Sequence, residues 1–182
     1  MAGASDPLTL RLSKGLRDLR ASRERLFAVL AGVSEEQFKR RPPVYAVSAA
    51  GDWSIAEVLA HLLAAEQRLC ARLEAQLAGE APPPGAVTDG ERHAEARLGR
   101  TVPVPQIIHG LLAARRRLEG ALSAIEARWT APAEPAQPKR PPYVAPDAIA
   151  ALLQHEAIAH EQEHTAQIEA VKAVLPARLA RS

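Results

Sequence analysis

The residues of this chain best suited to chemistry are two histidines near its C-terminal end. His160 and His164 stand four positions apart in the stretch AHEQEHTAQI, residues 159–168. Residues four apart lie on one face of a helix, one turn from each other, so two imidazoles at this spacing can reach one metal ion. The same letters, H-E-x-x-H, also spell a zinc-protease motif, in which the glutamate (here Glu161) acts as base. A metal site and a protease are therefore the first two hypotheses.

The protease hypothesis fails because a third metal ligand is missing. Zinc proteases take it from a glutamate on a following helix, or from the extended form H-E-x-x-H-x-x-G-x-x-H. The 18 residues after His164, which end in PARLARS, predict no further helix. The extended form needs glycine and histidine where this chain has Gln167 and Ala170. We therefore expect no peptidase activity and no role for Glu161 as its base.

Composition argues against several other classes of function. Only 3% of the residues are aromatic, the formal net charge is +2, and Ala and Leu dominate. This composition favours helices over sheets, and it contains no basic stripe that would indicate nucleic-acid binding. Cys70 is the only cysteine, which excludes an internal disulfide and a C-x-x-C site. With neither a signal peptide nor an apolar run of about 18 residues, we expect a cytoplasmic protein with no membrane partner.

Four leucine-rich periodic segments must position the histidines. They predict helices at 7–31, 54–79, 104–129 and 147–175, each with one apolar face. Helices of this kind pack into an all-α four-helix bundle. We predict a single domain over residues 1–182, with long crossover loops.

Local motifs mark where the helices begin. Asp6 followed by proline caps the first helix. Ser34 opens a capping box for a short extra turn, which RRPP ends. Ser54 and Glu57 form the capping box of the second helix, where Trp53 precedes the cap.

Two long connections separate the later helices. Residues 80–101 are polar and are expected to form a loop, which contains His93. After Trp129 the prolines of TAPAEPAQPKRPPYVAP favour an extended crossover. His109, on the helix between these connections, is expected to point away from the leucine face.

The helical rotation places both histidines of the last helix toward the core. Counted from Ile149 at 100° per residue, His160 falls at about 20° and His164 at about 60°. His155 falls at about 240°, on the solvent side. Further polar residues are predicted on the inward side, where they could support a metal or accept a proton: Glu156, Glu163 and Gln167.

Other interpretations of the two histidines stay open at this point. Each could be a hydrogen-bonded core residue, although two unpartnered buried imidazoles would cost about 1–3 kcal/mol each. A di-iron bundle would need two E-x-x-H motifs, and the only one here ends at His164. On the second helix His61 lies at the edge of the apolar face, where it could be a rim residue or a third ligand.

The stretches WSIAEVLAHL (53–62) and AHEQEHTAQI (159–168) resemble the DinB-like (YfiT-like) family of four-helix-bundle metalloproteins. The resemblance covers nearly the whole chain. It implies one divalent metal ion, zinc or nickel, held by His61, His160 and His164. Characterised members include transferases that act with low-molecular-weight thiols such as bacillithiol or mycothiol, and family members are often dimeric.

Three neutral imidazoles leave coordination positions open, which is the layout of a catalytic metal site. We expect a metal-dependent enzyme, a low-molecular-weight-thiol S-transferase or detoxification enzyme acting on a small molecule. Cys70 has no evident activator, so the thiolate would come from a cosubstrate. The alternatives are a hydrolase that uses metal-bound water and a non-catalytic, stress-linked bundle that binds metal or a partner. No catalytic residue is assigned.

The sequence and the resemblance also predict a homodimer. Leu63 and Trp129 lie outside the main apolar faces and could form a patch that pairs with its own copy across a two-fold axis. The long loops could equally cover them.

Overall fold

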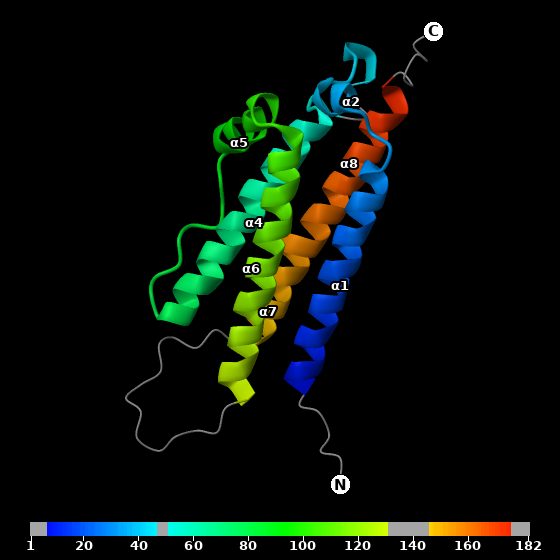
Figure 1. Ribbon diagram of the computed structural model, residues 1–182. Helices are drawn as coiled ribbons and strands as arrows, with labels where there is room; N and C mark the ends of the chain where they lie inside the picture. Colours follow the sequence, from blue (N-terminus) through cyan, green and yellow to red (C-terminus); the bar gives the residue numbers. More distant parts are fainter. Residues whose placement is uncertain (1–6, 47–50, 131–145, 176–182) are drawn as a thin grey trace.

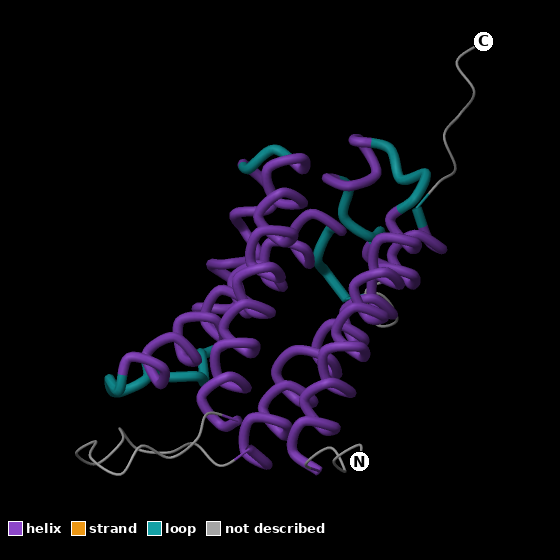
Figure 2. The backbone as a smooth tube through the Cα atoms, turned by 60° about the horizontal axis from the view of Figure 1, so that its bottom comes forward, coloured by secondary structure: helices purple, strands orange, loops and turns teal. Residues whose placement is uncertain are grey.

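The computed structural model describes residues 7–46, 51–130 and 146–175 (Figure 1). All regular structure in these ranges is helical, as the composition predicts, and Figure 2 shows helices joined by short loops. In chain order the elements are α1 (Pro7–Leu30), α2 (Glu35–Lys39), the 3₁₀ turn η1 (Val44–Ala46), α4 (Ile55–Ala78), α5 (Asp89–Thr101), α6 (Val104–Thr130), α7 (Pro146–Leu152), the π-helical segment η2 (Leu153–Ala159) and α8 (His160–Val174).

The predicted four-helix bundle is confirmed. Figure 1 shows α1, α4, α6 and the continuous α7–η2–α8 rod lying side by side. The most extensive packing is that of α4, against α6 and against α5, and α1 packs against α8. None of the helices in the described ranges is both long and apolar enough to cross a membrane.

The predicted starts of α2 and α4 are also correct. The Ser54 Oγ accepts a hydrogen bond from the backbone N–H of Glu57, while the Glu57 carboxylate accepts one from the backbone N–H of Ser54 (2.9 Å). Ser34 and Gln37 form the same reciprocal box at α2. The Asp6 cap, the proline-rich crossover at 131–145 and residues 176–182 lie outside the described residues.

The expected polar loop at 80–101 is wrong over its second half. Residues 89–101 form α5, so His93 lies on a helix. Its start is a capping box, with the Thr88 Oγ1 accepting from the backbone N–H of Glu91. At Gly99 the helix backbone approaches α4 so closely that a Cβ would lie 2.2 Å from the Ala56 carbonyl oxygen. Glycine therefore lets α5 dock on α4.

The inward placement of two glutamates on the last helix is also wrong. Glu156 and Glu163 are both exposed. The prediction assumed a regular α-helix from Ile149 onward, but η2 is π-helical. Its i→i+5 hydrogen bonds add residues per turn and so change the direction in which later side chains point. His155 is exposed, as predicted.

A charged layer divides the bundle core into two apolar clusters. On each long helix one buried charged residue stands between a leucine or isoleucine of one cluster and one of the other. The members of this charged layer, one from each of α1, α4, α6 and α8, are Arg23, Glu66, Arg115 and Glu161. The sequence analysis did not identify this layer.

Leu63 and Trp129, the two residues expected in a dimer patch, are both partly buried within their own chain. Leu63 packs against the core cluster around Leu59 and Trp129 against the one around Leu122. They are therefore covered by packing inside the bundle, and the described structure does not test the homodimer itself.

Candidate metal centre

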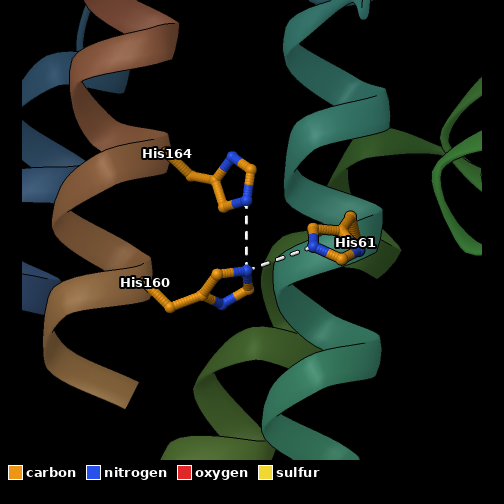
Figure 3. A group of neighbouring side chains, drawn as sticks. All are labelled: His61, His160 and His164. Carbon is orange, nitrogen blue, oxygen red and sulfur yellow. Dashed lines mark hydrogen bonds between the residues drawn. The ribbon is translucent and has the colours of Figure 1, made fainter. Parts of the chain in front are cut away.

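The three histidines singled out in the sequence lie together between α4 and α8. Figure 3 shows His160 and His164 on one helix and His61 on the other, with their rings turned toward each other. The His160 Nε2 lies 3.1 Å from the Nε2 of His61 and 3.1 Å from the Nε2 of His164. One ring nitrogen from each of the three falls within 4.8 Å of the other two, so the group could hold a metal ion.

The environment of the three rings is partly closed. His61 is 3% exposed, whereas His160 and His164 are half-buried. The Trp53 ring stacks against His164 at a centroid distance of 6.4 Å and meets the edge of His61 at 5.3 Å. The indole N–H of Trp53 donates a hydrogen bond to the Nδ1 of His93 (3.3 Å), a residue of α5.

Hydrogen bonds orient two of the three rings. The His61 Nδ1–H donates to the Oε2 of Glu95 (3.2 Å), and the His164 Nδ1–H donates to the Oε1 of Gln167 (2.7 Å). A neutral imidazole has a single N–H, so a proton held at Nδ1 leaves the Nε2 lone pair free to bind a metal. Gln167 was predicted on the inward side and lies there. The polar partner of His61 was not predicted.

The rings are held in their neutral form. Burial lowers the pKa of His61 to about 3 and that of His160 to about 4, and the neighbouring imidazoles add to both shifts. The pKa of His164 is also lowered, mainly by burial. Neutral imidazole is the form that binds a metal.

This arrangement fits a metal better than it fits a hydrogen-bonded core. If His61 and His164 carry their protons at Nδ1, His160 can donate its one proton to only one of the two facing Nε2 atoms. At least one of the Nε2 lone pairs of His61 and His164 is then left without a donor among the three rings. Two nitrogens bound to one tetrahedral zinc at about 2.0–2.1 Å lie roughly 3.3–3.4 Å apart, close to the 3.1 Å contacts.

Glu161, the glutamate of the H-E-x-x-H letters, belongs to the charged layer. It is 2% exposed, and its Oε2 accepts hydrogen bonds from Arg23 (2.8 Å) and Arg115 (2.9 Å). Two guanidinium groups neutralise this carboxylate, so it is not available as a base.

The thiol of Cys70 is unsuited to nucleophilic chemistry. The side chain is buried, and its Sγ lies 3.4 Å from the Ala114 carbonyl oxygen. Burial raises the pKa of the thiol to about 11, so little thiolate forms near neutral pH.

Helix α5 supplies residues beside the three histidines that the sequence analysis missed. Glu95 lies on α5 and bridges His61 to Arg68 of α4. The missed signal was the T-x-x-E capping box at Thr88, the same kind of motif that marks α2 and α4. A helix at 89–101 places Glu91 and Glu95 one turn apart, but their distance to His61 is set only by how α5 docks.

Comparison with known proteins identifies a family. The sequence model of the DinB superfamily matches residues 18–168, which include all three histidines. No curated protein and no solved structure matches this chain.

Proposed function

The chain belongs to the DinB superfamily, and we propose that its three histidines bind one divalent metal ion, zinc or nickel, in an enzyme that transfers low-molecular-weight thiols. The convergence of the Nε2 atoms of His61, His160 and His164 carries this proposal. Imidazole nitrogen suits both metals, and three such donors are the protein ligand set of several catalytic zinc sites.

Held by these three imidazoles, a metal ion would supply Lewis acidity that lowers the pKa of a thiol or water bound beside it. The chain's own residues prepare this position. Glu95 keeps the His61 proton at Nδ1, Gln167 does the same for His164, and Trp53 covers one side of the rings. These contacts support binding through Nε2 of both rings.

The thiol in the proposed reaction comes from a cosubstrate. Cys70 is buried among apolar side chains and remains protonated near neutral pH. An external thiol bound beside the three histidines would instead lie at a partly exposed position, because His160 and His164 are half-buried.

The hydrolase alternative has less support from the described residues. Such an enzyme needs a carboxylate near the metal to accept a proton from water. Glu161 is neutralised in the charged layer, and Glu156 and Glu163 are exposed. Glu95 is close to His61 but is already paired with Arg68.

Metal analysis combined with turnover tests the proposal. The purified protein should contain about one zinc or nickel ion per chain. After metal removal and reloading, it should accelerate conjugation of a low-molecular-weight thiol to an electrophile such as 1-chloro-2,4-dinitrobenzene. His61→Ala, His160→Ala and His164→Ala should each lose bound metal and turnover together.

The exposed histidines provide matched controls. His109→Ala and His155→Ala remove the same group from α6 and η2 and should retain both metal and rate. An equal rate in metal-free and metal-loaded protein would contradict a metal-dependent enzyme. Full metal content without turnover on any thiol tested would favour the non-catalytic metal-binding bundle.

We also propose that the protein is a homodimer. Within the described ranges, Tyr45 is 84% exposed and Leu98 is 55% exposed, so large apolar side chains remain on the surface. Light scattering across a dilution series should give twice the chain mass of 19.5 kDa. A mass near 19.5 kDa at every concentration would exclude the dimer.

A further inference from the structure

One glycine lies directly against the amide that orients His164. Gly51 is in the segment that leads to the N-cap of α4, and its φ of +72° is in the left-handed region that favours glycine. A Cβ built on Gly51 would lie 2.7 Å from the Nε2 of Gln167 and 3.7 Å from its Cδ. Non-bonded atoms of this kind normally lie about 3.5 Å apart or more. The amide of Gln167 therefore occupies the space that a side chain at this position would need.

The orientation of this amide decides which nitrogen of His164 carries the proton. A glutamine amide accepts at its oxygen and donates at its nitrogen, so either end could face the Nδ1 of the ring. In the structure the His164 Nδ1–H donates to the Oε1 of Gln167 (2.7 Å), and the Nε2 is the end of the amide that faces Gly51. A reversed amide would donate to Nδ1, and the proton of the neutral ring would then lie on Nε2, where it blocks metal binding.

The missing side chain of Gly51 gives the amide nitrogen its place. The Oε1 and Nε2 of Gln167 are the two ends of one planar group, so a Cβ that displaces the nitrogen also moves the oxygen away from His164. The displaced amide can turn about its own side-chain bonds. A side chain at this position should therefore affect the hydrogen bond to His164 much more than the packing of the bundle.

We propose that Gly51 is a positioning residue for His164: because it has no side chain, the Gln167 amide can hold the His164 proton at Nδ1. The inference rests on the proposed metal centre and adds a residue that prepares one ligand of it through Gln167.

Gly51→Ala tests the inference, and Gly32→Ala is its matched control. Gly32 has nearly the same backbone conformation, with φ +76°, but a Cβ built there meets no heavy atom within 4 Å. Both variants carry the cost of alanine at positive φ, and only Gly51→Ala displaces Gln167. Gly51→Asn and Gly32→Asn form a second pair, to be used if Gly51→Ala does not fold, because asparagine adopts the left-handed region more readily.

Two measurements on the full chain report the effect. Long-range proton–nitrogen correlation spectra of the metal-free protein near neutral pH distinguish the two histidine tautomers, and His164→Ala assigns the His164 signals. We expect the Nδ1–H tautomer in the parent and in Gly32→Ala, and a mixture of both tautomers in Gly51→Ala. Zinc affinity, from competition with a chromophoric chelator, should fall about tenfold in Gly51→Ala and stay within about twofold of the parent in Gly32→Ala.

Combination with Gln167→Ala tests whether Gly51 acts through the amide. Gln167→Ala should itself lower zinc affinity about tenfold. Once the amide is absent, Gly51→Ala has nothing to displace, so the double variant should bind zinc about as tightly as Gln167→Ala alone. A further loss of about tenfold in the double variant would overturn the inference, because Gly51→Ala would then act by another route, such as a shift of Trp53.

Failure of the inference and failure of the proposed function give different results. An unchanged His164 tautomer in Gly51→Ala, an equal change in Gly32→Ala, or a mixture of tautomers already in the parent overturns the role of Gly51 alone. A parent that binds no zinc overturns the proposed metal centre, while the metal-free spectra still decide whether Gly51 sets the tautomer of His164.

Discussion

The charged layer takes one residue from each of the four long helices, and the histidine cluster takes its residues from two of them, α4 and α8, yet the two groups satisfy their polar atoms in opposite ways. In the charged layer Glu66 accepts from both arginines, at 2.5 and 2.6 Å, and two spare arginine N–H groups reach backbone carbonyls of Leu111 and Leu19. Among the layer's carboxylate oxygens, only the Oε1 of Glu161 has no partner in the described structure.

The histidine cluster contains three neutral donors whose lone pairs converge without enough protons to share. The two arginines and two glutamates pair their charges, whereas the three imidazoles present lone pairs that could bind a metal ion. Both the charged layer and the histidine cluster contain buried polar groups, so burial of polar groups alone does not indicate function. What distinguishes the histidines is that their ring nitrogens converge within reach of one metal ion.

Breaking the charged layer should produce the largest effect. Arg115→Met keeps an unbranched apolar side chain but leaves Glu66 and Glu161 to share Arg23. Removing one partner of a buried ion pair costs about 3–5 kcal/mol of unfolding free energy. Urea denaturation should show this loss.

The double variant Arg115→Met/Glu66→Gln provides the control. It removes one charge of each sign, so it should recover part of the loss. A change below about 1 kcal/mol in Arg115→Met would contradict the view that the layer is structural.

Breaking the histidine cluster should instead affect metal binding. His160 contacts both other rings, so His160→Ala should lower metal affinity by about 100-fold or more. Competition with a chromophoric chelator measures the affinity. His155→Ala should match the parent, and a similar loss in both variants would contradict the assignment of His160.

A smaller effect on metal binding is expected at Glu95, which orients the His61 ring but is not a proposed metal ligand. Glu95→Ala removes the acceptor of the His61 Nδ1 proton, and we expect metal affinity to fall by about tenfold. Arg97→Ala, an exposed change on the same helix, is the control for damage to α5. Isothermal titration with zinc would measure both; unchanged affinity in Glu95→Ala would remove α5 from the centre.

The smallest effect is expected at Glu57, a buried carboxylate paired with arginines at the surface. Burial raises its pKa, but hydrogen bonds from Arg41, Ser54 and Arg100 outweigh this and lower it to about 2. Arg41 and Arg100 are 42% and 50% exposed, so we expect Glu57→Gln to cost only about 1 kcal/mol, with the cap geometry kept.

The sign of the pH dependence follows from the lowered pKa. The ionised carboxylate stabilises the folded state above the ordinary pKa of a glutamate, 4.5, and this contribution is lost as pH falls toward about 2. Thermal unfolding of parent and Glu57→Gln should therefore converge at low pH. A difference that stays constant from pH 7 to pH 2 would contradict the ion pairs as its cause.

Much of the fold could be predicted because its signals are local. Leucine spacing predicted the four long helices, and the boxes at Ser34 and Ser54 predicted where two helices begin. Helix α5 has the same kind of box but no leucine face, and for that reason it was taken for a loop. The π-helical segment leaves no local signal that a count at 100° per residue can detect, so Glu156 and Glu163 were misplaced.

The same distinction applies to the site: some of its features follow from local sequence, and others depend on how the helices pack. The sequence by itself determined that His160 and His164 share a helix face, because four residues make about one turn. That His61 joins them, and that Glu95 holds its Nδ1, are contacts across 99 and 34 residues of chain. Such contacts depend on how α4, α5 and α8 pack, since the position of one helix against another is set by side chains from both. Only the tertiary structure could decide them.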